Sequence, residues 1–400
     1  MQKKTVRDIQ VNGKRVLIRV DFNVPLDINS KTISDDSRIR ASLPTIKYLI
    51  DHKAKVILCS HFGRPKGKVV EGLRMAPIAQ HLSQLIGLPV NTAGDCVGKE
   101  VENQVETLKE GDILLLENVR FHPEEEANNP RFAQELARLA DVYVNDAFGT
   151  AHRAHASTVG IAEYLPAVAG FLMEKELEAM GKLLTSPERP FACLMGGAKV
   201  SDKIGLIQNM LKKLDVLLIG GGMAATFLRA QGYQVGHSSI EEDKLSLASQ
   251  LLQEAKDYKV PLLLPIDVTV AQEIKAKTST KILPIANIPS NSYIVDIGSQ
   301  TIELFRNELR KCHTIMWNGP MGIYEIPQFA QGTRLLVNFL SAINATTVIG
   351  GGSSAEIVQE MGVAEKMTHV STGGGASLRF LEGATLPGVE VLQDLTKGQK

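Results

Sequence analysis

The segment FLMEKELEAMGKLL, residues 171–184, divides the chain and decides how the rest of it is organised. Met173, Leu177 and Met180 recur at helical spacing and Pro187 ends the pattern, which predicts a helix. Eleven of the seventeen arginines precede it, whereas every pair of adjacent glycines follows it. We therefore predict that the helix joins a half that binds an anionic small molecule to a half that binds a nucleotide. The alternative is an ordinary linker helix between two unrelated domains.

Length and composition narrow the class of protein. A chain of 400 residues exceeds the roughly 250–300 residues over which one hydrophobic core keeps growing, so two domains are expected. A formal net charge of zero provides no global field for nucleic acid or anionic membrane. The first residues, MQKKTVRDIQ, do not resemble a signal peptide, and no apolar run approaches transmembrane length. We expect a cytoplasmic, soluble protein.

The cysteines predict neither a disulfide framework nor a zinc site. They are widely separated and form no CxxC pair. Two of them lie inside apolar runs, as buried reduced thiols do. The four are Cys59, Cys96, Cys193 and Cys312, of which the first and third lie in apolar runs.

Short apolar runs alternate with amphipathic segments in both halves, which is typical of parallel sheets covered on both faces. We predict an α/β fold: two doubly wound, Rossmann-like parallel-sheet domains joined by a hinge helix. No fixed-period repeat is present, which excludes solenoids and propellers. The first-half runs are 15–20, 56–59, 113–116 and 142–144, with helical patterns at 39–50, 78–86 and 132–139. The second-half runs are 191–195, 216–219, 262–264, 294–297, 315–317, 348–349 and 369–370.

Polar side chains follow the strands predicted in the first half, at the ends where open α/β sheets bind ligands. Arg38 opens a helix, where its charge opposes the helix dipole and implies an anionic partner. Arg153 lies in a stretch rich in glycine and alanine rather than in a charged surface segment. Guanidinium and imidazole groups gathered in this way suit bidentate phosphate binding.

Purely structural interpretations of the same residues remain open. Any single arginine is more simply explained by an ion pair with Asp21, Glu117 or Asp146, although that does not explain polar groups at all four strand ends. His152 and His155 have metal-like spacing, but without further ligands we interpret them as polar scaffold.

In the second half the strand ends carry glycines. GGAKVSDK at 196–203 follows a strand and is predicted to open a helix, with two lysines one turn apart at its start, an arrangement that binds phosphate. Triple glycines at 220–222, 350–352 and 373–375 repeat the arrangement, but neither a P-loop nor a dinucleotide fingerprint is present. WNGPMGIYE at 317–325 suggests an apolar slot for a base and ribose. It is otherwise a tight turn with a buried aromatic residue.

Over essentially its whole length the sequence resembles the phosphoglycerate kinase family. The matching segments are RVDFNVP from Arg19, SHFGRP from Ser60, LLENVRFHPEEE from Leu115, VNDAFGTAHRAHAST from Val144, GGAKVSDKI from Gly196, GGGMA from Gly220, WNGPMG from Trp317 and STGGGAS from Ser371. The resemblance implies a monomeric, two-lobed, Mg²⁺-dependent kinase. It would transfer a phosphoryl group reversibly between ATP and the carboxylate of 3-phosphoglycerate, giving ADP and 1,3-bisphosphoglycerate. No nucleic acid or membrane partner is expected.

The resemblance also implies roles for individual residues. Phosphoglycerate would be held by Asp21, Asn23, Arg38, His61, Phe62, Gly63, Arg64, Arg120 and Arg153. The nucleotide would be held by Gly197, Ala198, Lys199, Lys203, Gly220, Gly221, Ile294, Asn318, Pro320, Ile323, Glu325, Gly351, Gly352, Ser353 and Ser354. Catalysis would fall to Arg38 and Lys199, with amides of Gly351, Gly352, Gly374 and Gly375.

Two positions depart from the family pattern. The third glycine-rich loop normally continues with an aspartate that helps to hold Mg²⁺, whereas this chain has Ser353. A small residue is usual at the position of Ile294, so its side chain is expected to narrow the adenine slot.

The resemblance sets expected domain boundaries and leaves two alternative functions open. We expect a phosphoglycerate domain at 1–170, the interdomain helix at 171–185, a nucleotide domain at 186–381, and a tail at 382–400 that packs on the first domain. One alternative is a kinase for another phosphorylated carboxylate or an alcohol. The other is a metabolite-binding protein without turnover, against which the presence of both Arg38 and Lys199 argues.

Overall fold

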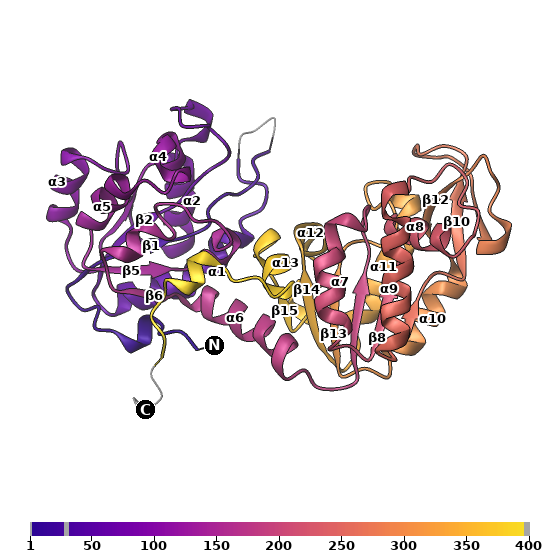
Figure 1. The fold of residues 1–400 in the computed structure, drawn as a ribbon. Helices are drawn as coiled ribbons and strands as arrows, with labels where there is room; N and C mark the ends of the chain where they lie inside the picture. The colour runs from indigo at the N-terminus through magenta and orange to yellow at the C-terminus, as the bar shows by residue number, and fades with distance from the viewer. Residues whose placement is uncertain (1, 28–31, 396–400) are drawn as a thin grey trace. The chain divides into compact units, whose positions relative to one another are not determined.

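The computed structural model describes residues 2–27 and 32–395. The chain divides into two compact units, Met1–Glu178 with Thr385–Lys400, and Ala179–Ala384. The division falls inside the predicted central helix, which the structure confirms as α6, Phe171–Thr185 (Figure 1). Of the expected tail, residues 385–395 belong to the first unit, and residues 396–400 lie outside the described part of the chain.

The first unit is built on a parallel sheet in the order β3-β4-β2-β1-β5-β6. Its central strands are buried on both faces, as expected for strands covered by helices on both sides. The strands are β1 Arg15–Arg19, β2 Lys55–Cys59, β3 Val90–Thr92, β4 Ile113–Leu115, β5 Val142–Asn145 and β6 Ala167–Ala169. The helices are α1 Ser37–Asp51, α2 Ala76–Ile86, α3 Lys99–Thr107, α4 Pro123–Glu126, α5 Pro130–Arg138 and α14 Pro387–Glu390.

The second unit is also built on a parallel sheet, in the order β15-β14-β13-β7-β8-β9. One face packs against α7, α8 and α9, and the other against α10, α11 and α12. The strands are β7 Phe191–Met195, β8 Val216–Ile219, β9 Leu262–Leu263, β13 Thr314–Asn318, β14 Thr346–Gly350 and β15 His369–Val370. The helices are α7 Ile204–Leu211, α8 Met223–Ala230, α9 Leu245–Asp257, α10 Ser299–Leu309, α11 Gln331–Leu340, α12 Gly352–Glu360 and α13 Gly375–Leu381.

The second unit also carries a separate antiparallel sheet that the sequence did not predict. Its order is β11-β10-β12, with β10 at Asp267–Ala271, β11 at Thr280–Pro284 and β12 at Tyr293–Ile297. The run at 294–297 therefore belongs to this sheet, and its assignment to the parallel sheet was wrong. β11 is largely exposed, so it lacks the apolar run on which the prediction relied.

No helix in the described residues combines the length and apolar character needed to cross a membrane.

Asp146 holds the start of α6 in place. Its Oδ1 accepts hydrogen bonds from the amides of Leu172, at 2.9 Å, and Met173, at 3.4 Å, while the amide of Phe171 donates to Thr45 Oγ1 at 2.9 Å. A carboxylate suits the amides of a helix N-terminus. Because the group is fully buried, loss of hydration outweighs these bonds and raises the pKa of Asp146 to about 7.

We expect Asp146→Asn to flatten the pH dependence of stability. Between the ordinary aspartate pKa, about 3.9, and about 7, the folded chain holds a proton that the unfolded chain has released, so stability falls as pH rises. One such proton is worth about 1.4 kcal/mol per pH unit in that window. Urea unfolding at several pH values gives the free energy of unfolding as a function of pH, and its slope should be shallower in the variant. Asp51→Asn, on the exposed end of α1, should keep the slope of the natural protein. The same dependence of unfolding free energy on pH in Asp146→Asn and in the natural protein would contradict the expectation.

Candidate active site

The predicted anion-binding side chains of the first unit are brought together at the carboxyl ends of its central strands. β4, β2, β1 and β5 are neighbours in the sheet, so the loops that follow them meet at one edge. Asn23 Oδ1 accepts from the amide of Gly63 at 2.8 Å, and the carbonyl of Gly63 accepts from Arg120 Nη1 at 3.0 Å. Arg38 Nη1 lies 2.8 Å from Asp21 Oδ2. Backbone and side chains from three strand ends and α1 thus form one connected cluster.

Arg19 is the buried centre of this cluster and fixes the tautomer of His61. Its Nη2 lies 3.2 Å from His61 Nδ1, and its Nη1 donates to the carbonyl of Val20. A guanidinium has donors only, so His61 Nδ1 must accept and the ring proton must lie on Nε2. Burial, followed by the charges of Arg19 and Arg120, holds the pKa of His61 well below its usual value. His61 is therefore a neutral ring whose remaining polar group is an Nε2–H donor.

A buried relay that the sequence reasoning missed supports Arg19 from behind. Arg19 Nε donates to Ser157 Oγ at 2.8 Å, and Ser157 Oγ donates in turn to Glu125 Oε1 at 2.6 Å. Glu125 is fully buried, and loss of hydration raises its pKa. Both relay partners stand within motifs that carry the family resemblance, PEEE and AHAST, but nothing in either motif indicates that they meet.

The cluster has an excess of positive charge. Burial and the charges of Arg120, Arg19 and Arg153 lower the pKa of His155 to about 4. Among the described residues, neither Arg153 nor the exposed Arg64 forms an ion pair. Arg153 lowers the pKa of this imidazole without forming an ion pair, whereas Arg120 Nε lies 3.2 Å from Glu126 Oε1, and an unpaired guanidinium of this kind favours an anionic ligand.

The acidic residues of these strand ends have separate partners. Asp21 pairs with Arg38, as the ion-pair alternative predicted. Glu117 pairs instead with Arg74, at 3.1 Å, and Asp146 caps α6 without an arginine. Among the described residues, ion pairs therefore account for Arg38 and, through Glu126 at 3.2 Å rather than a strand-end acid, for Arg120, but not for Arg64 or Arg153.

In the second unit, the first glycine clusters serve close packing between strand-end loops. A Cβ on Gly196 would lie 2.1 Å from the carbonyl oxygen of Pro320, and one on Gly221 would lie 2.6 Å from the amide nitrogen of Gly197. The amides of Gly197 and Gly221 donate to the carbonyls of Pro320, at 2.8 Å, and Met321, at 3.0 Å. These two amides are thus engaged in the fold and are not free for a phosphate.

The two lysines of this region differ more than the sequence predicted. The expected helix start lies later, because a short 3-10 turn at Ser201–Lys203 precedes α7. Lys199 is exposed in the preceding loop, whereas Lys203 is buried and donates from Nζ to Asn318 Oδ1. Burial lowers the pKa of Lys203 to about 8. Lys199 is consequently the lysine that is open to a ligand.

The later glycine clusters, at the starts of α12 and α13, are open. A Cβ on Gly352 or Gly374 would meet nothing within 4 Å. The first amides of a helix have no partner within it and attract anions. Ser354 is buried and its Oγ accepts from the amide of Gly319 at 2.6 Å, whereas Ser353 is exposed.

The proposed base slot is only partly as predicted. Trp317 is buried and its Nε1 donates to the carbonyl of Gly319 at 2.7 Å, so this part of the segment is a tight turn with a buried aromatic. Ile323 is half-buried and packs with Val295 and Phe329, and Glu325 is exposed. Ile294 packs elsewhere, against the cluster that contains Val235 and Leu228.

Comparisons with known proteins agree with this arrangement. The family model described as phosphoglycerate kinase matches residues 6–384. The chain is 58% identical over 398 residues to the phosphoglycerate kinase of Dictyoglomus turgidum, covering 98% of this chain and 100% of the relative. It is 58% identical over 394 residues to that of Pelotomaculum thermopropionicum, with the same coverage. The phosphoglycerate kinase structure from Coxiella burnetii superposes with a TM-score of 0.87 at 39% identity, covering 97% of this chain and 98% of that one.

Proposed function

Because the chain belongs to the phosphoglycerate kinase family, we propose how its residues carry out that family's reaction. The reaction is reversible phosphoryl transfer between ATP and the carboxylate of 3-phosphoglycerate, giving ADP and 1,3-bisphosphoglycerate. The observation that carries the assignment of roles is the cluster of guanidinium groups around neutral His61, which has more positive charge than its carboxylates balance.

We assign the acceptor to the first unit. Arg120 and Gly63 stiffen the loop beside His61, whose Nε2–H donates to an oxygen of phosphoglycerate. Arg64 and Arg153 are the cations that supply charge to its phosphate and carboxylate. A carboxylate with a pKa near 4 is already ionised at neutral pH, so the reaction needs no general base.

We assign the nucleotide to the second unit. The helix starts at Gly351–Gly352 and Gly374–Gly375 offer amides to phosphate oxygens, and a Cβ on Gly352 or Gly374 would meet nothing within 4 Å. Lys199 adds an exposed positive charge, and buried Lys203 holds Asn318 in place. The catalytic task is to orient the reactants and to neutralise charge on the migrating phosphoryl group, which we assign to Arg38 and Lys199 with these amides.

Because the two sets of residues belong to different units, we propose that catalysis involves closure about α6 when both substrates are bound. Small-angle scattering tests this: the radius of gyration should fall in the ternary complex and not with either substrate alone. An unchanged radius would remove the hinge from the mechanism.

A coupled assay for ATP-dependent formation of an acyl phosphate from 3-phosphoglycerate tests the proposed function as a whole. Glycerate and 2-phosphoglycerate serve as comparison acceptors, because the arginines should require a phosphate on the 3-position of the acceptor. Equal rates with all three acceptors would overturn the assignment of the guanidinium cluster to phosphoglycerate.

We further propose that the enzyme is a cytoplasmic monomer. Its four cysteines are buried free thiols, which fits a reducing compartment. Light scattering after size exclusion should give the mass of one chain, 43.5 kDa.

The residues present fit Mg²⁺ that the nucleotide carries. Mg²⁺ usually keeps several waters and is bound through phosphates with one or two protein groups. Ser353, exposed at the start of α12, offers a neutral hydroxyl, which is a weaker ligand for a hard cation than a carboxylate. The bound ion would supply charge neutralisation to the phosphates.

We therefore expect Ser353→Asp to lower the concentration of free Mg²⁺ needed for half-maximal activity by a few-fold, because the carboxylate adds a ligand. The natural enzyme should in turn accept Mn²⁺ more readily than the variant. Activity titrated against each metal at fixed nucleotide measures both, and Ser249→Asp, at an exposed position on α9, is the control. Superimposed Mg²⁺ curves would mean that Ser353 is a plain first-turn residue.

A further inference from the structure

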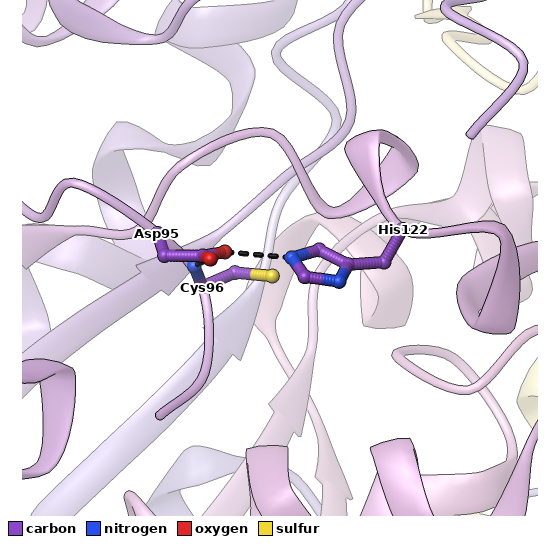
Figure 2. A group of neighbouring side chains, drawn as sticks. All are labelled: Asp95, Cys96 and His122. Carbon is purple, nitrogen blue, oxygen red and sulfur yellow. Dashed lines mark hydrogen bonds and ion pairs between the residues drawn. The ribbon is translucent and has the colours of Figure 1, made fainter. Parts of the chain in front are cut away.

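Three side chains of metal-ligand type meet in the first unit, away from the guanidinium cluster described above. Asp95 and Cys96 follow β3, and His122 follows the short 3-10 turn Val119–Phe121. Their ligand atoms all lie within 4.8 Å of one another, and no other group of this kind occurs in residues 2–27 and 32–395. Figure 2 shows the three side chains converging, with the sulfur beside the contact between carboxylate and imidazole. The proposed kinase mechanism uses none of them.

The contacts leave this group partly open to solvent. Asp95 Oδ1 accepts from the amide of Cys96 at 2.6 Å and lies 2.7 Å from His122 Nε2. The side chain of Asp95 is 52% exposed and that of His122 is 28% exposed, whereas Cys96 is buried. A cation can therefore approach along the carboxylate and imidazole and reach the sulfur last.

Thiolate, imidazole and carboxylate form a ligand set for Zn²⁺ and similar ions. Bond lengths of about 2.0–2.3 Å place the ligand atoms of a tetrahedral site about 3.3–3.6 Å apart. The ligand atoms, all within 4.8 Å of one another, would reach that spacing through side-chain rotation, with Asp95 Oδ1 and His122 Nε2 separating from 2.7 Å. We propose that Asp95, Cys96 and His122 bind one divalent transition metal of the zinc class, with water as the fourth ligand.

Asp95 as a carboxylate and Cys96 as a metal-bound thiolate together carry two negative charges, which balance those of a divalent cation.

Binding of the metal therefore displaces the proton of the Cys96 thiol and leaves the site without net charge. Neutrality matters because the sulfur is buried, where an unbalanced charge is costly. Glu124 and Glu135 also act on His122, and Glu125 acts on Cys96, so the surroundings favour a cation further.

Cobalt(II) tests the site directly, because a thiolate–cobalt bond gives a near-ultraviolet charge-transfer band. The full chain, without nucleotide or Mg²⁺, should bind one Co²⁺ with this band. Zn²⁺ should displace the Co²⁺ and remove the band. Cys96→Ser should abolish the band, whereas Cys312→Ser, the matched replacement of another buried free thiol, should retain it.

Two further variants keep the proposal testable if Cys96→Ser does not fold. Asp95→Asn and His122→Gln retain the sulfur and should weaken Co²⁺ binding at least tenfold, since even outer-shell changes cost about 10–100-fold. Absence of the band from the natural protein would overturn the proposal. So would its persistence in Cys96→Ser, or unchanged affinity in both ligand variants. Kinase activity plays no part in these outcomes.

Discussion

Replacing Arg38 with alanine should lower kcat at least about a hundredfold, or about 2.7 kcal/mol, while changing the KM for phosphoglycerate far less. Arg38 lies in the first turn of α1, where Asp21 holds its guanidinium at 2.8 Å beside the ligand-binding loops. A charge directed at the migrating phosphoryl group acts mainly in the transition state, so its loss affects kcat rather than binding.

The matched control is Arg40→Ala, two residues further along the same helix. Arg40 is exposed and pairs with Asp36 at 2.8 Å, so its loss should leave both constants near their natural values. Arg64→Ala is a second comparison and should mainly raise KM, because we assign Arg64 to binding. A natural kcat in Arg38→Ala would exclude the catalytic role.

Replacing Gly221 with alanine should destabilise the second unit by about 3 kcal/mol or more. The new Cβ would lie 2.6–2.8 Å from backbone atoms of Gly197 and Pro320, which cannot rotate away as a side chain can. The backbone at Gly221 also has a φ of +67°, which costs an alanine about 1–2 kcal/mol. Overpacking adds typically 1–3 kcal/mol.

Gly232→Ala separates these two costs. Gly232 has a φ of +93°, but a Cβ there would meet nothing within 4 Å, so only the backbone cost of about 1–2 kcal/mol should appear. Urea unfolding of both variants measures the difference. Equal destabilisation would show that the contact between the loops is not close enough to matter.

The central strands could be predicted because they are buried on both faces, and the central helix because its apolar residues recur at helical spacing. The runs at 191–195 and 216–219 coincide with β7 and β8, and 171–184 coincides with α6 to within a residue. β3 and β11 were not predicted, because their residues are mostly exposed and so carry no apolar run. β6 and β10 are largely buried and were also missed, because β6 has only three residues and the apolar residues of β10 alternate with polar ones.

Residues of the candidate site were predictable where strand ends gather them and not where distant loops do. Asn23 and Gly63 follow adjacent strands, so their meeting follows from the sheet order. Glu125 and Ser157 meet through loops, and no spacing in the sequence indicates that contact. The cysteine spacing likewise predicted no metal site, because the partners of Cys96 would be an aspartate and a histidine that the fold supplies.

Glycine clusters look alike in sequence but divide into two kinds in the structure. At Gly196 and Gly221 the missing side chain allows three loops to touch, whereas at Gly352 and Gly374 it leaves space. Local sequence does not distinguish these cases, because the difference lies in what approaches from another strand end.

Residues 385–395 belong to the first unit, so this unit cannot be completed during synthesis until the second unit has been translated. The amide of Lys4 donates to the carbonyl of Gln393 at 2.8 Å, Lys3 pairs with Asp394, and Asn145 Nδ2 donates to the carbonyl of Gly388 at 3.0 Å. The nascent first unit therefore lacks these contacts until all of residues 179–384 have been translated. At about 5–20 residues per second that delay lasts roughly 10–40 seconds. During it the residues that will contact 385–395 are accessible to a chaperone. The second unit is then the one able to finish folding first.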